Sequence, residues 1–445
     1  MTHPSIRQIE LVETDQIIPF HANARTHSKK QINKIARSMQ QRGVTNPLLI
    51  DEDNVLLAGH GRLAAAVHLG LRKLPCIRMS GMSEEDKRGY RLADNQLALE
   101  AGWDFELLAG ELQFLVDADF DVGLTGFDDA EVDIILTEQQ ARSVDPASPD
   151  DEISPVAPGV EAVTRDGDLW ILGSHRLLCG NARSGAALDR LMEEERADMA
   201  FTDAPYNVPI NGHVGGNGRT RHREFAEASG EMTPDAYREF LRATLGNLAR
   251  SCRDGAIVYS CIDWRHLPDI LAVGAELFTE LKNLCVWNKT NAGMGSFYRS
   301  QHELVTVWKA GQAGHINNFG LGERGRHRSN VWTYAGVNTF RPGRIEELEL
   351  HPTVKPVAMV ADAIRDVSHR GQIVLDVFGG SGTTLIAAEK TGRYARLLEI
   401  DPLYCDAIVG RWEKQSGKPA VLAGQDLTFE EVAQSRRIER KEAEQ

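Results

Sequence analysis

A carboxylate, a proline and an aromatic residue follow a hydrophobic stretch that predicts a strand at 198–202. The stretch runs into Asp203-Ala204-Pro205-Tyr206. At such a strand end, a carboxylate and a proline-restrained backbone can hold an amino group, and an aromatic ring can stack on a planar partner. The pattern therefore indicates a site for the amine of a base. The alternative is an ordinary turn, because Asp, Pro and Asn are common turn residues.

A glycine-rich turn between a strand and a helix marks a second candidate site. Glycines let the backbone approach a ligand closely, and a helix start offers free N–H groups to a polar or anionic group. The turn lacks the lysine of a phosphate P-loop and the G-x-G-x-x-G spacing of a dinucleotide motif. The candidate ligand-binding residues are Asp376, Phe378, Gly379, Gly380, Ser381, Gly382 and Thr383.

Glu399 ends a further predicted strand at 394–399, some twenty residues after the glycine turn. A carboxylate there could hold the two hydroxyls of a ribose. Both features follow strands at the edge where open α/β sheets bind ligands. The alternative is a tight β–α turn with a solvated glutamate.

Strands and helices alternate through most of the second half of the chain. After a predicted hairpin at 169–179, strands are predicted at 198–202, 255–260, 282–287, 373–377 and 394–399, and helices at 184–195, 234–251, 356–369, 382–391 and 403–415. Such alternation predicts an α/β fold with a mainly parallel sheet covered on both faces. The interval 290–345 breaks the rhythm and indicates a long irregular insertion with a function.

The first part of the chain predicts a smaller α/β domain. A helix at 28–42, short strands at 46–50, 55–58 and 74–79, and a helix after Gly59-His60-Gly61-Arg62 are followed by acidic amphipathic helices at 84–99 and 104–117. Four prolines indicate a linker at 141–162. The expected organisation is therefore an N-terminal domain with a helical extension at 1–140, the linker, a second domain at 163–416 and a charged tail at 417–445.

The net charge of −14 comes from 64 acidic and 50 basic residues, but the charge is uneven. Residues 22–83 carry ten Lys and Arg against three Asp and Glu, residues 84–162 carry four against twenty-one, and residues 282–344 carry nine against two. The two basic blocks indicate local contacts with a polyanion, or else an uneven solvated surface. The six cysteines are scattered, which argues against a disulfide scaffold or a zinc finger, and we expect no bound metal. The absence of a long apolar stretch predicts no membrane association and a cytoplasmic location.

Several motifs resemble those of S-adenosylmethionine-dependent amino-group DNA methyltransferases. Residues 203–206 resemble the D-P-P-Y motif, residues 376–384 resemble the cofactor loop, and His351-Pro-Thr-Val-Lys-Pro356 is similar to the segment that encloses the methionine end of the cofactor. A catalytic motif ahead of the cofactor loop resembles the β class. The resemblance spans about 163–415 and implies a Rossmann-like methyltransferase fold with further cofactor residues at Thr353, Lys355 and Pro356.

Ala204 departs from the family motif, which normally has proline there. The resemblance implies that the Asp203 side chain and the carbonyl of residue 204 accept hydrogen bonds from the target amine and localise its lone pair. Alanine retains this carbonyl but lacks the fixed φ of proline, and we expect the chemistry to be retained. The resemblance also implies that the target nucleotide is flipped out of the duplex and stacks on Tyr206.

Asp203, where some relatives have serine, is more typical of adenine-N6 than of cytosine-N4 enzymes, so the resemblance predicts methylation of adenine N6 in double-stranded DNA. Cytosine N4 is the alternative. Sequence recognition is expected in the basic insertion and in the basic segment 211–223, since arginine contacts guanine edges and phosphates. The candidate DNA-binding residues are Arg219, Arg221, Arg223, Arg299, Arg324, Arg326 and Arg328. For any single arginine, solvated surface is the alternative.

Residues 23–27 and 58–65 resemble the N-terminal domain of ParB partition proteins, a fold shared with sulfiredoxin. That family binds phosphates at a loop opening a helix, which implies a nucleotide, CTP or ATP, at Gly59, His60 and Arg62. Gly61 stands where ParB proteins usually have a second arginine, so a degenerate domain that only binds DNA or a partner is the alternative. Resemblance to the β class also implies a homodimer. A weakly catalytic DNA-binding regulator and a methyltransferase acting on RNA or a protein amide are the remaining alternatives.

Overall fold

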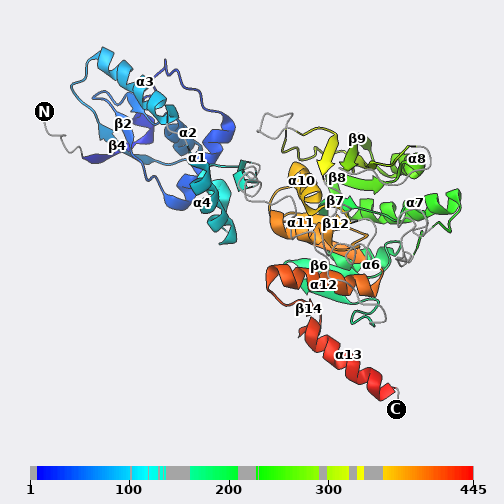
Figure 1. Ribbon diagram of the computed structural model, residues 1–445. Helices are drawn as coiled ribbons and strands as arrows, with labels where there is room; N and C mark the ends of the chain where they lie inside the picture. Colours follow the sequence, from blue (N-terminus) through cyan, green and yellow to red (C-terminus); the bar gives the residue numbers. More distant parts are fainter. Residues whose placement is uncertain are drawn as a thin grey trace. The chain divides into compact units, whose positions relative to one another are not determined.

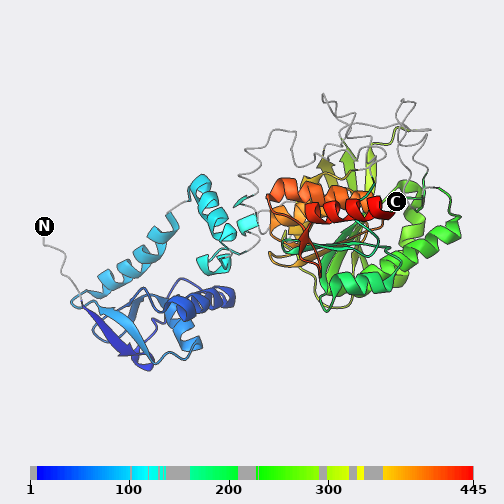
Figure 2. The same ribbon diagram turned by 90° about the horizontal axis from the view of Figure 1, so that it is seen from below.

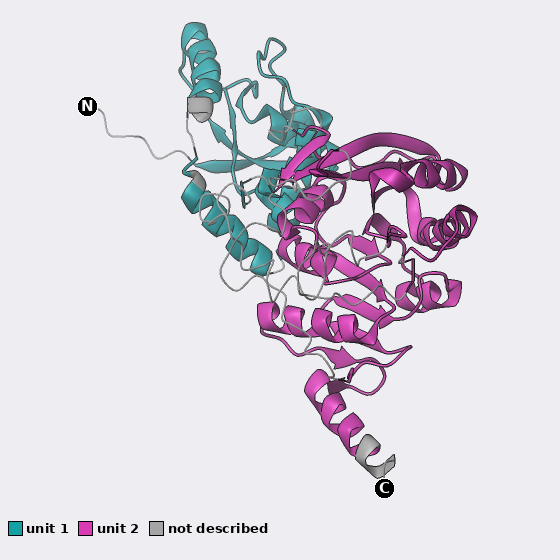
Figure 3. Ribbon diagram, turned by 45° about the vertical axis from the view of Figure 1, so that its right-hand side comes forward, with its two compact units in different colours: residues 1–143 teal, residues 144–445 magenta. Residues whose placement is uncertain are grey.

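A computed structural model describes most of the chain. The described residues are 8–100, 103–118, 120–128, 131–133, 135–136, 161–208, 227–228, 230–289, 298–319, 328–334 and 354–443. The chain divides into two compact units, residues 1–143 and residues 144–445, which we call the N-terminal and C-terminal units (Figure 3). In the described part of the chain, no helix is both long and apolar enough to cross a membrane.

The N-terminal unit contains a small mixed sheet with strand order β1-β4-β2-β3. Its core is formed by buried aliphatic side chains from the strands and α2, such as Leu48, Leu63 and Leu74. Ser28 caps α1 by accepting a hydrogen bond from the backbone N–H of Gln31, as expected of a serine at a helix start. The main elements are β1 (Ile9–Glu13), α1 (Lys29–Arg42), β2 (Leu48–Ile50), β3 (Leu56–Ala58), α2 (His60–His68), β4 (Lys73–Arg78), α3 (Glu84–Glu100) and α4 (Phe105–Asp117).

The C-terminal unit is built on an eleven-stranded sheet with the order β11-β9-β10-β8-β7-β12-β13-β6-β5-β14-β15 (Figure 1). The five strands from β8 to β6 in this order run parallel to one another. The strands are β5 (Leu169–Leu172), β6 (His175–Cys179), β7 (Ala197–Thr202), β8 (Cys252–Ile262), β9 (Glu280–Lys289), β10 (His302–Lys309), β11 (Val331–Tyr334), β12 (Ile373–Asp376), β13 (Tyr394–Glu399), β14 (Val421–Leu422) and β15 (Leu427–Thr428). The predicted α/β fold is thus confirmed.

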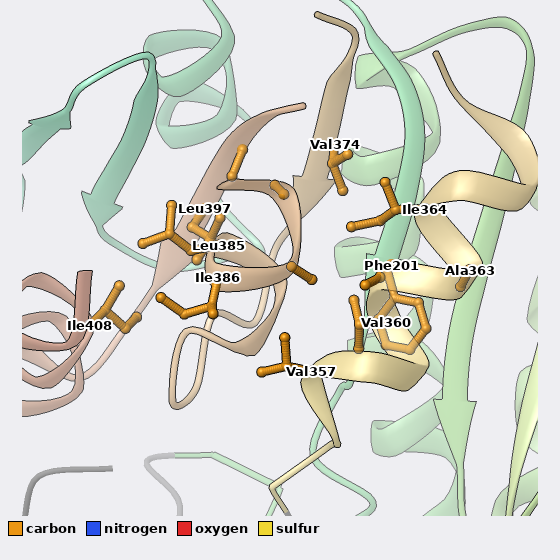
Figure 4. Packing of buried hydrophobic residues seen from close by; sticks show 14 of the residues in the cluster. Phe201, Val357, Val360, Ala363, Ile364, Val374, Leu385, Ile386, Leu397 and Ile408 are labelled. Carbon is orange, nitrogen blue, oxygen red and sulfur yellow. The ribbon is translucent and has the colours of Figure 1, made fainter. Parts of the chain in front are cut away.

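Helices cover both faces of the large sheet (Figure 2) because successive strand residues point to opposite faces. Phe201, Val374 and Leu397 pack in one core with α10, α11 and α12 (Figure 4). Their neighbours in sequence, such as Ala200 and Leu375, pack in a second core with α6 and α7. The helices are α6 (Gly185–Met192), α7 (Pro234–Ser251), α8 (Leu267–Leu277), α10 (Val357–Val367), α11 (Thr383–Thr391), α12 (Pro402–Ser416) and α13 (Phe429–Ala443).

Two expectations about irregular regions need correction. The interval 290–345 contains β10, an internal strand that pairs antiparallel with both β8 and β9. Residues 417–445, expected to be a charged tail, contain β14, β15 and α13. Arg436 of α13 forms an ion pair with Asp168 at 2.5 Å, so this helix is attached to the unit. In both regions, polar or glycine-rich neighbours made the sequence look irregular. Contacts with distant parts of the unit, through strand pairing or an ion pair, nevertheless order these residues.

Candidate functional site

The two motifs at strand ends lie side by side in the C-terminal unit. β7 and β12 are parallel neighbours, so Asp203, just after β7, and Asp376, at the end of β12, reach the same edge of the sheet. Both line one pocket, together with Glu399 at the end of β13. Further lining residues include Gly180, Asn181, Ala204, Pro205, Tyr206, Glu227, Lys355, Phe378, Gly379, Gly380, Ser381, Thr383, Asp401 and Tyr404.

Both carboxylate oxygens of Asp203 accept hydrogen bonds. Tyr206 Oη donates to Oδ1 at 2.6 Å, and Lys355 Nζ donates to Oδ2 at 2.5 Å. The Asp203 side chain remains about one-fifth exposed (21%) at the pocket, whereas that of Lys355 is buried. Asp203 is therefore an oriented acceptor that a ligand in the pocket can reach.

A second carboxylate, Glu303 of β10, completes this cluster and was not foreseen from the sequence. Its Oε2 lies 3.0 Å from Lys355 Nζ and 3.2 Å from Tyr206 Oη, and its Oε1 accepts from Lys289 Nζ at 2.5 Å. The four charged groups form two acid–base pairs, so their formal charges cancel. The alternation of Val305 and Val307 in β10 is the sequence signal that could have revealed this strand.

The charge states of the cluster follow from its burial and its lysines. Burial raises the pKa of the Asp203 carboxyl and the Glu303 carboxylate adds to this effect, whereas Lys355 opposes both. Burial also disfavours the charge on Glu303, but Lys355 and Lys289 outweigh it and lower the pKa of Glu303 to about 2. The pKa of Tyr206 is raised by burial and by the two carboxylates, so its hydroxyl stays a hydrogen-bond donor.

The turn that carries Asp203 is held by side chains from the surrounding structure. Ala204 is buried among apolar residues of α7 and α8, and Tyr237 Oη donates to the carbonyl of Pro205 at 3.0 Å. Asn207 has a positive φ of 52°, and its side chain bonds the backbone of Gly230 and Met232. Packing and hydrogen bonds therefore restrain the turn although residue 204 is not proline.

The glycine turn forms a backbone cradle next to two buried carboxylates. Glu399 accepts from the N–H groups of Gly380, at 2.7 Å, and Asp401, at 2.9 Å. Asp376 accepts from Phe378 N at 3.0 Å and from Thr384 Oγ1 at 2.6 Å. Burial raises the pKa of each carboxyl to about 7, against the opposing effect of these hydrogen bonds.

Space beside the turn is restricted by Ile408 of α12. A Cβ on Gly379 would lie 3.2 Å from Ile408 Cδ1, and a Cβ on Gly382 would lie 3.1 Å from Ile408 Cγ1. Gly382 also has a φ of +81°, which disfavours other residues. Glycine at these positions thus lets the turn pack closely against α12.

The residues expected around the methionine end of a cofactor are only partly described. Thr353 lies outside the described residues, and Pro356 is the N-terminal cap of α10. Lys355 lines the pocket, but its ammonium contacts Asp203 and Glu303. Its role in holding a cofactor stays a prediction, and its position adds it to the cluster of Asp203, Tyr206 and Glu303.

The arginines predicted to bind DNA fall into three groups. Arg219, Arg221, Arg223, Arg324 and Arg326 lie outside the described residues. Arg299 is exposed. Arg328 is largely buried, forms ion pairs with Asp366 at 2.9 Å and Asp362 at 3.6 Å, and lies over the ring of Trp332. These contacts give Arg328 a structural role, and its contact with DNA stays a prediction.

In the N-terminal unit, Gly59 has a φ of +106° and caps the start of α2, which carries His60 and Arg62. Arg62 Nη1 donates to the carbonyls of Asn46 and Pro47, both at 2.9 Å, so part of its guanidinium holds a neighbouring loop. His60 Nε2 is buried without a hydrogen-bond partner among the described residues. The structure brings the three residues together, and a nucleotide at this loop stays a prediction.

Three family models match successive parts of the chain. Residues 2–96 match the ParB N-terminal domain, residues 106–166 match the ParB-methyltransferase helix-turn-helix domain, and residues 197–410 match a DNA methylase model for N6 and N4 methylation. The last of these ranges includes both Asp203 and the glycine turn. The second range overlaps the segment 141–162 that the sequence indicated as a linker.

Individual proteins are similar to parts of the chain. The ParB-like nuclease domain-containing protein YnaK of Escherichia coli K12 is 44% identical over 73 residues, which are 16% of this chain and 84% of that protein. YubD of the same organism, a proposed methylase, is 26% identical over 196 residues, 44% of this chain and 73% of that protein. The crystal structure of the M1.HpyAVI–SAM complex superposes with a TM-score of 0.40 at 18% identity, covering 53% of this chain and 97% of that one.

Proposed function

We propose that this chain methylates adenine N6 in double-stranded DNA. The premise is that the chain is a DNA methyltransferase of the adenine-N6 or cytosine-N4 amino-methyltransferase family with an N-terminal ParB domain. The observation that carries the proposal is the position of Asp203. Its carboxylate reaches the pocket that the glycine turn and Glu399 also line. Aspartate at this position, rather than serine, supports adenine.

The far side of the pocket has the chemistry that S-adenosylmethionine requires. Glu399 is a buried acceptor suited to ribose hydroxyls, and Gly379 and Gly380 line the pocket with backbone alone. The residues that would hold the cofactor are those of the turn, Asp376 to Thr383, together with Glu399. When bound, S-adenosylmethionine supplies a methyl group on a positively charged sulfur.

The residues after β7 would prepare the target amine. The lone pair of an exocyclic amine is delocalised into the base, so the amine is a weak nucleophile. Hydrogen bonds to the Asp203 carboxylate and the Ala204 carbonyl would draw it towards tetrahedral geometry and localise the lone pair. Tyr206 would stack on the flipped base. The protein thus acts chiefly through positioning and electrostatics, and Asp203 need not be a strong base.

The direct test incubates the full chain with S-adenosylmethionine labelled in its methyl group and mixed-sequence duplex DNA, then digests the DNA to nucleosides. We expect the label in N6-methyl-2′-deoxyadenosine, and labelling slower by about 100-fold or more with Asp203→Asn. Label in N4-methyl-2′-deoxycytidine would retain the mechanism but refute adenine as the target base. Label in neither nucleoside, with the cofactor bound, would refute the proposed activity.

The proposal includes a homodimer acting in the cytoplasm, which rests on resemblance to β-class enzymes and on the family's DNA substrate. Light scattering coupled to size-exclusion chromatography tests the oligomeric state, and a monomeric mass at micromolar concentration would refute the dimer.

A further inference from the structure

Asp203, Tyr206, Glu303 and Lys355 form a cluster in which the two carboxylates share their hydrogen-bond donors. Tyr206 Oη lies 2.6 Å from Asp203 Oδ1 and 3.2 Å from Glu303 Oε2. Lys355 Nζ lies 2.5 Å from Asp203 Oδ2 and 3.0 Å from Glu303 Oε2. Each donor is therefore within hydrogen-bond distance of both carboxylates.

The two donors differ in the number of protons they can offer. The ammonium of Lys355 has three N–H groups and can serve Asp203 and Glu303 together. The hydroxyl of Tyr206 has one proton and donates to one acceptor at a time. Its shorter contact is with Asp203, so Glu303 is the second acceptor within its reach.

A target amine would approach a carboxylate that already accepts two hydrogen bonds. Lys355 donates to Oδ2 and the Tyr206 hydroxyl donates to Oδ1 of Asp203, and each oxygen keeps one further acceptor site. Displacing that hydroxyl would be costly if its proton were left without an acceptor in a buried site. The cost is small when another carboxylate accepts it, because one charge-assisted hydrogen bond replaces another.

We propose that Glu303 is a positioning residue that accepts the Tyr206 hydroxyl hydrogen bond when the target amine takes its place on Asp203 Oδ1. The inference rests on the proposed function, since the amine is that of the target base. The exchange requires a rotation of the hydroxyl and a small side-chain movement. No covalent bond forms or breaks, and the proton stays on Tyr206.

The surroundings of Glu303 suit this role. Glu303 lies on β10, between β8 and β9, and is only 8% exposed. Lys289 donates to Oε1, so the other oxygen, Oε2, is the one near Tyr206 and Lys355. Because the two lysines keep Glu303 ionised, the acceptor is present throughout the neutral pH range.

The test is a double-mutant cycle of Glu303→Gln and Tyr206→Phe, read as the single-turnover rate of methyl transfer at saturating cofactor. Glutamine keeps the shape of the side chain but is a weaker acceptor, so the hydroxyl stays on Asp203. We expect Glu303→Gln to lower the rate about tenfold when Tyr206 is present. In the Tyr206→Phe background, where no hydroxyl has to move, the same substitution should change the rate less than about twofold.

The controls separate this role from a merely structural one. Glu280→Gln removes an exposed carboxylate that pairs with Lys282 on β9, and its rate should equal that of the unmodified chain. Cofactor affinity should be unchanged in Glu303→Gln. If that variant fails to fold, Glu303→Asp keeps the charge between the lysines but withdraws the acceptor from Tyr206, and it should give the same pattern.

Equal rate losses from the Glu303 substitution in both backgrounds would overturn the inference, since Glu303 would then act independently of the Tyr206 hydroxyl. An unmodified chain that methylates no nucleoside would instead refute the proposed function, and with it the inference. An active unmodified chain with additive losses refutes the inference alone.

Discussion

Gly382 offers a quantitative test of the cofactor loop because two separable effects oppose any side chain there. With a φ of +81°, alanine would be in the left-handed region, at a cost of about 1–2 kcal/mol. Its Cβ would also lie 3.1 Å from Ile408 Cγ1 and 3.2 Å from Cγ2, and overpacking of this kind costs about 1–3 kcal/mol. We therefore expect Gly382→Ala to destabilise the C-terminal unit by about 2–5 kcal/mol in total.

Two other glycines of the same unit provide matched controls. Gly371 has a similar φ of +75° but no heavy atom within 4 Å of an added Cβ, so Gly371→Ala should cost only the backbone term, about 1–2 kcal/mol. Gly410, inside α12, has no positive φ and no atom within 4 Å, so Gly410→Ala should stabilise by about 0.5–1 kcal/mol.

Calorimetry on the full chain measures the transition of the C-terminal unit, where about 1 kcal/mol corresponds to roughly 2–4 °C in Tm. Titration with S-adenosylmethionine measures the cofactor site. Gly382→Ala should lower Tm more than Gly371→Ala, and only Gly382→Ala should weaken cofactor binding. Equal Tm losses, or cofactor affinity that is unchanged in Gly382→Ala, would refute the reasoning about Ile408 and the loop.

Three further predictions follow from the charged groups. Asp203→Asn should lower the methyl-transfer rate by about 100-fold or more while cofactor affinity, measured by titration, stays within twofold; a rate near that of the unmodified chain would exclude the acceptor role. Because burial raises the pKa of Glu399 to about 7 in the folded state, from 4.5 in the unfolded chain, the folded state holds a proton that the unfolded state has lost. Glu399 should therefore lower the free energy of unfolding of the ligand-free chain by up to about 1.4 kcal/mol per pH unit as pH rises from about 4.5 to 7. Asp376, whose pKa is also raised to about 7, adds to this slope, and Glu399→Gln should remove only the contribution of Glu399. Cofactor affinity should rise between about pH 6 and 8. Arg328→Gln leaves Asp366 buried with a weaker partner and should lower the free energy of unfolding, measured by thermal unfolding, by about 3–5 kcal/mol. Arg299→Gln should leave Tm unchanged and weaken DNA binding. The reverse pattern would assign the DNA contact to Arg328.

The sequence by itself determined the fold class and the two motif positions, because those depend on short-range patterns. Alternating strands and helices predicted the α/β fold, since hydrophobic period is a local property. Asp203 and Glu399 could be assigned to one edge of a sheet because parallel strands end together. Gly382 could be assigned to a close turn by residue type alone.

The tertiary structure alone decided which charged groups meet. Tyr206 and Glu303 are 97 positions apart, and Lys355 and Asp203 are 152 apart, so these contacts depend on strand order and on the direction in which each side chain points. Arg328 gave the same basic signal in the sequence as exposed Arg299, yet packing pairs it with Asp366. A charge pattern does not specify partners, because the partner of a charge is set by the fold around it.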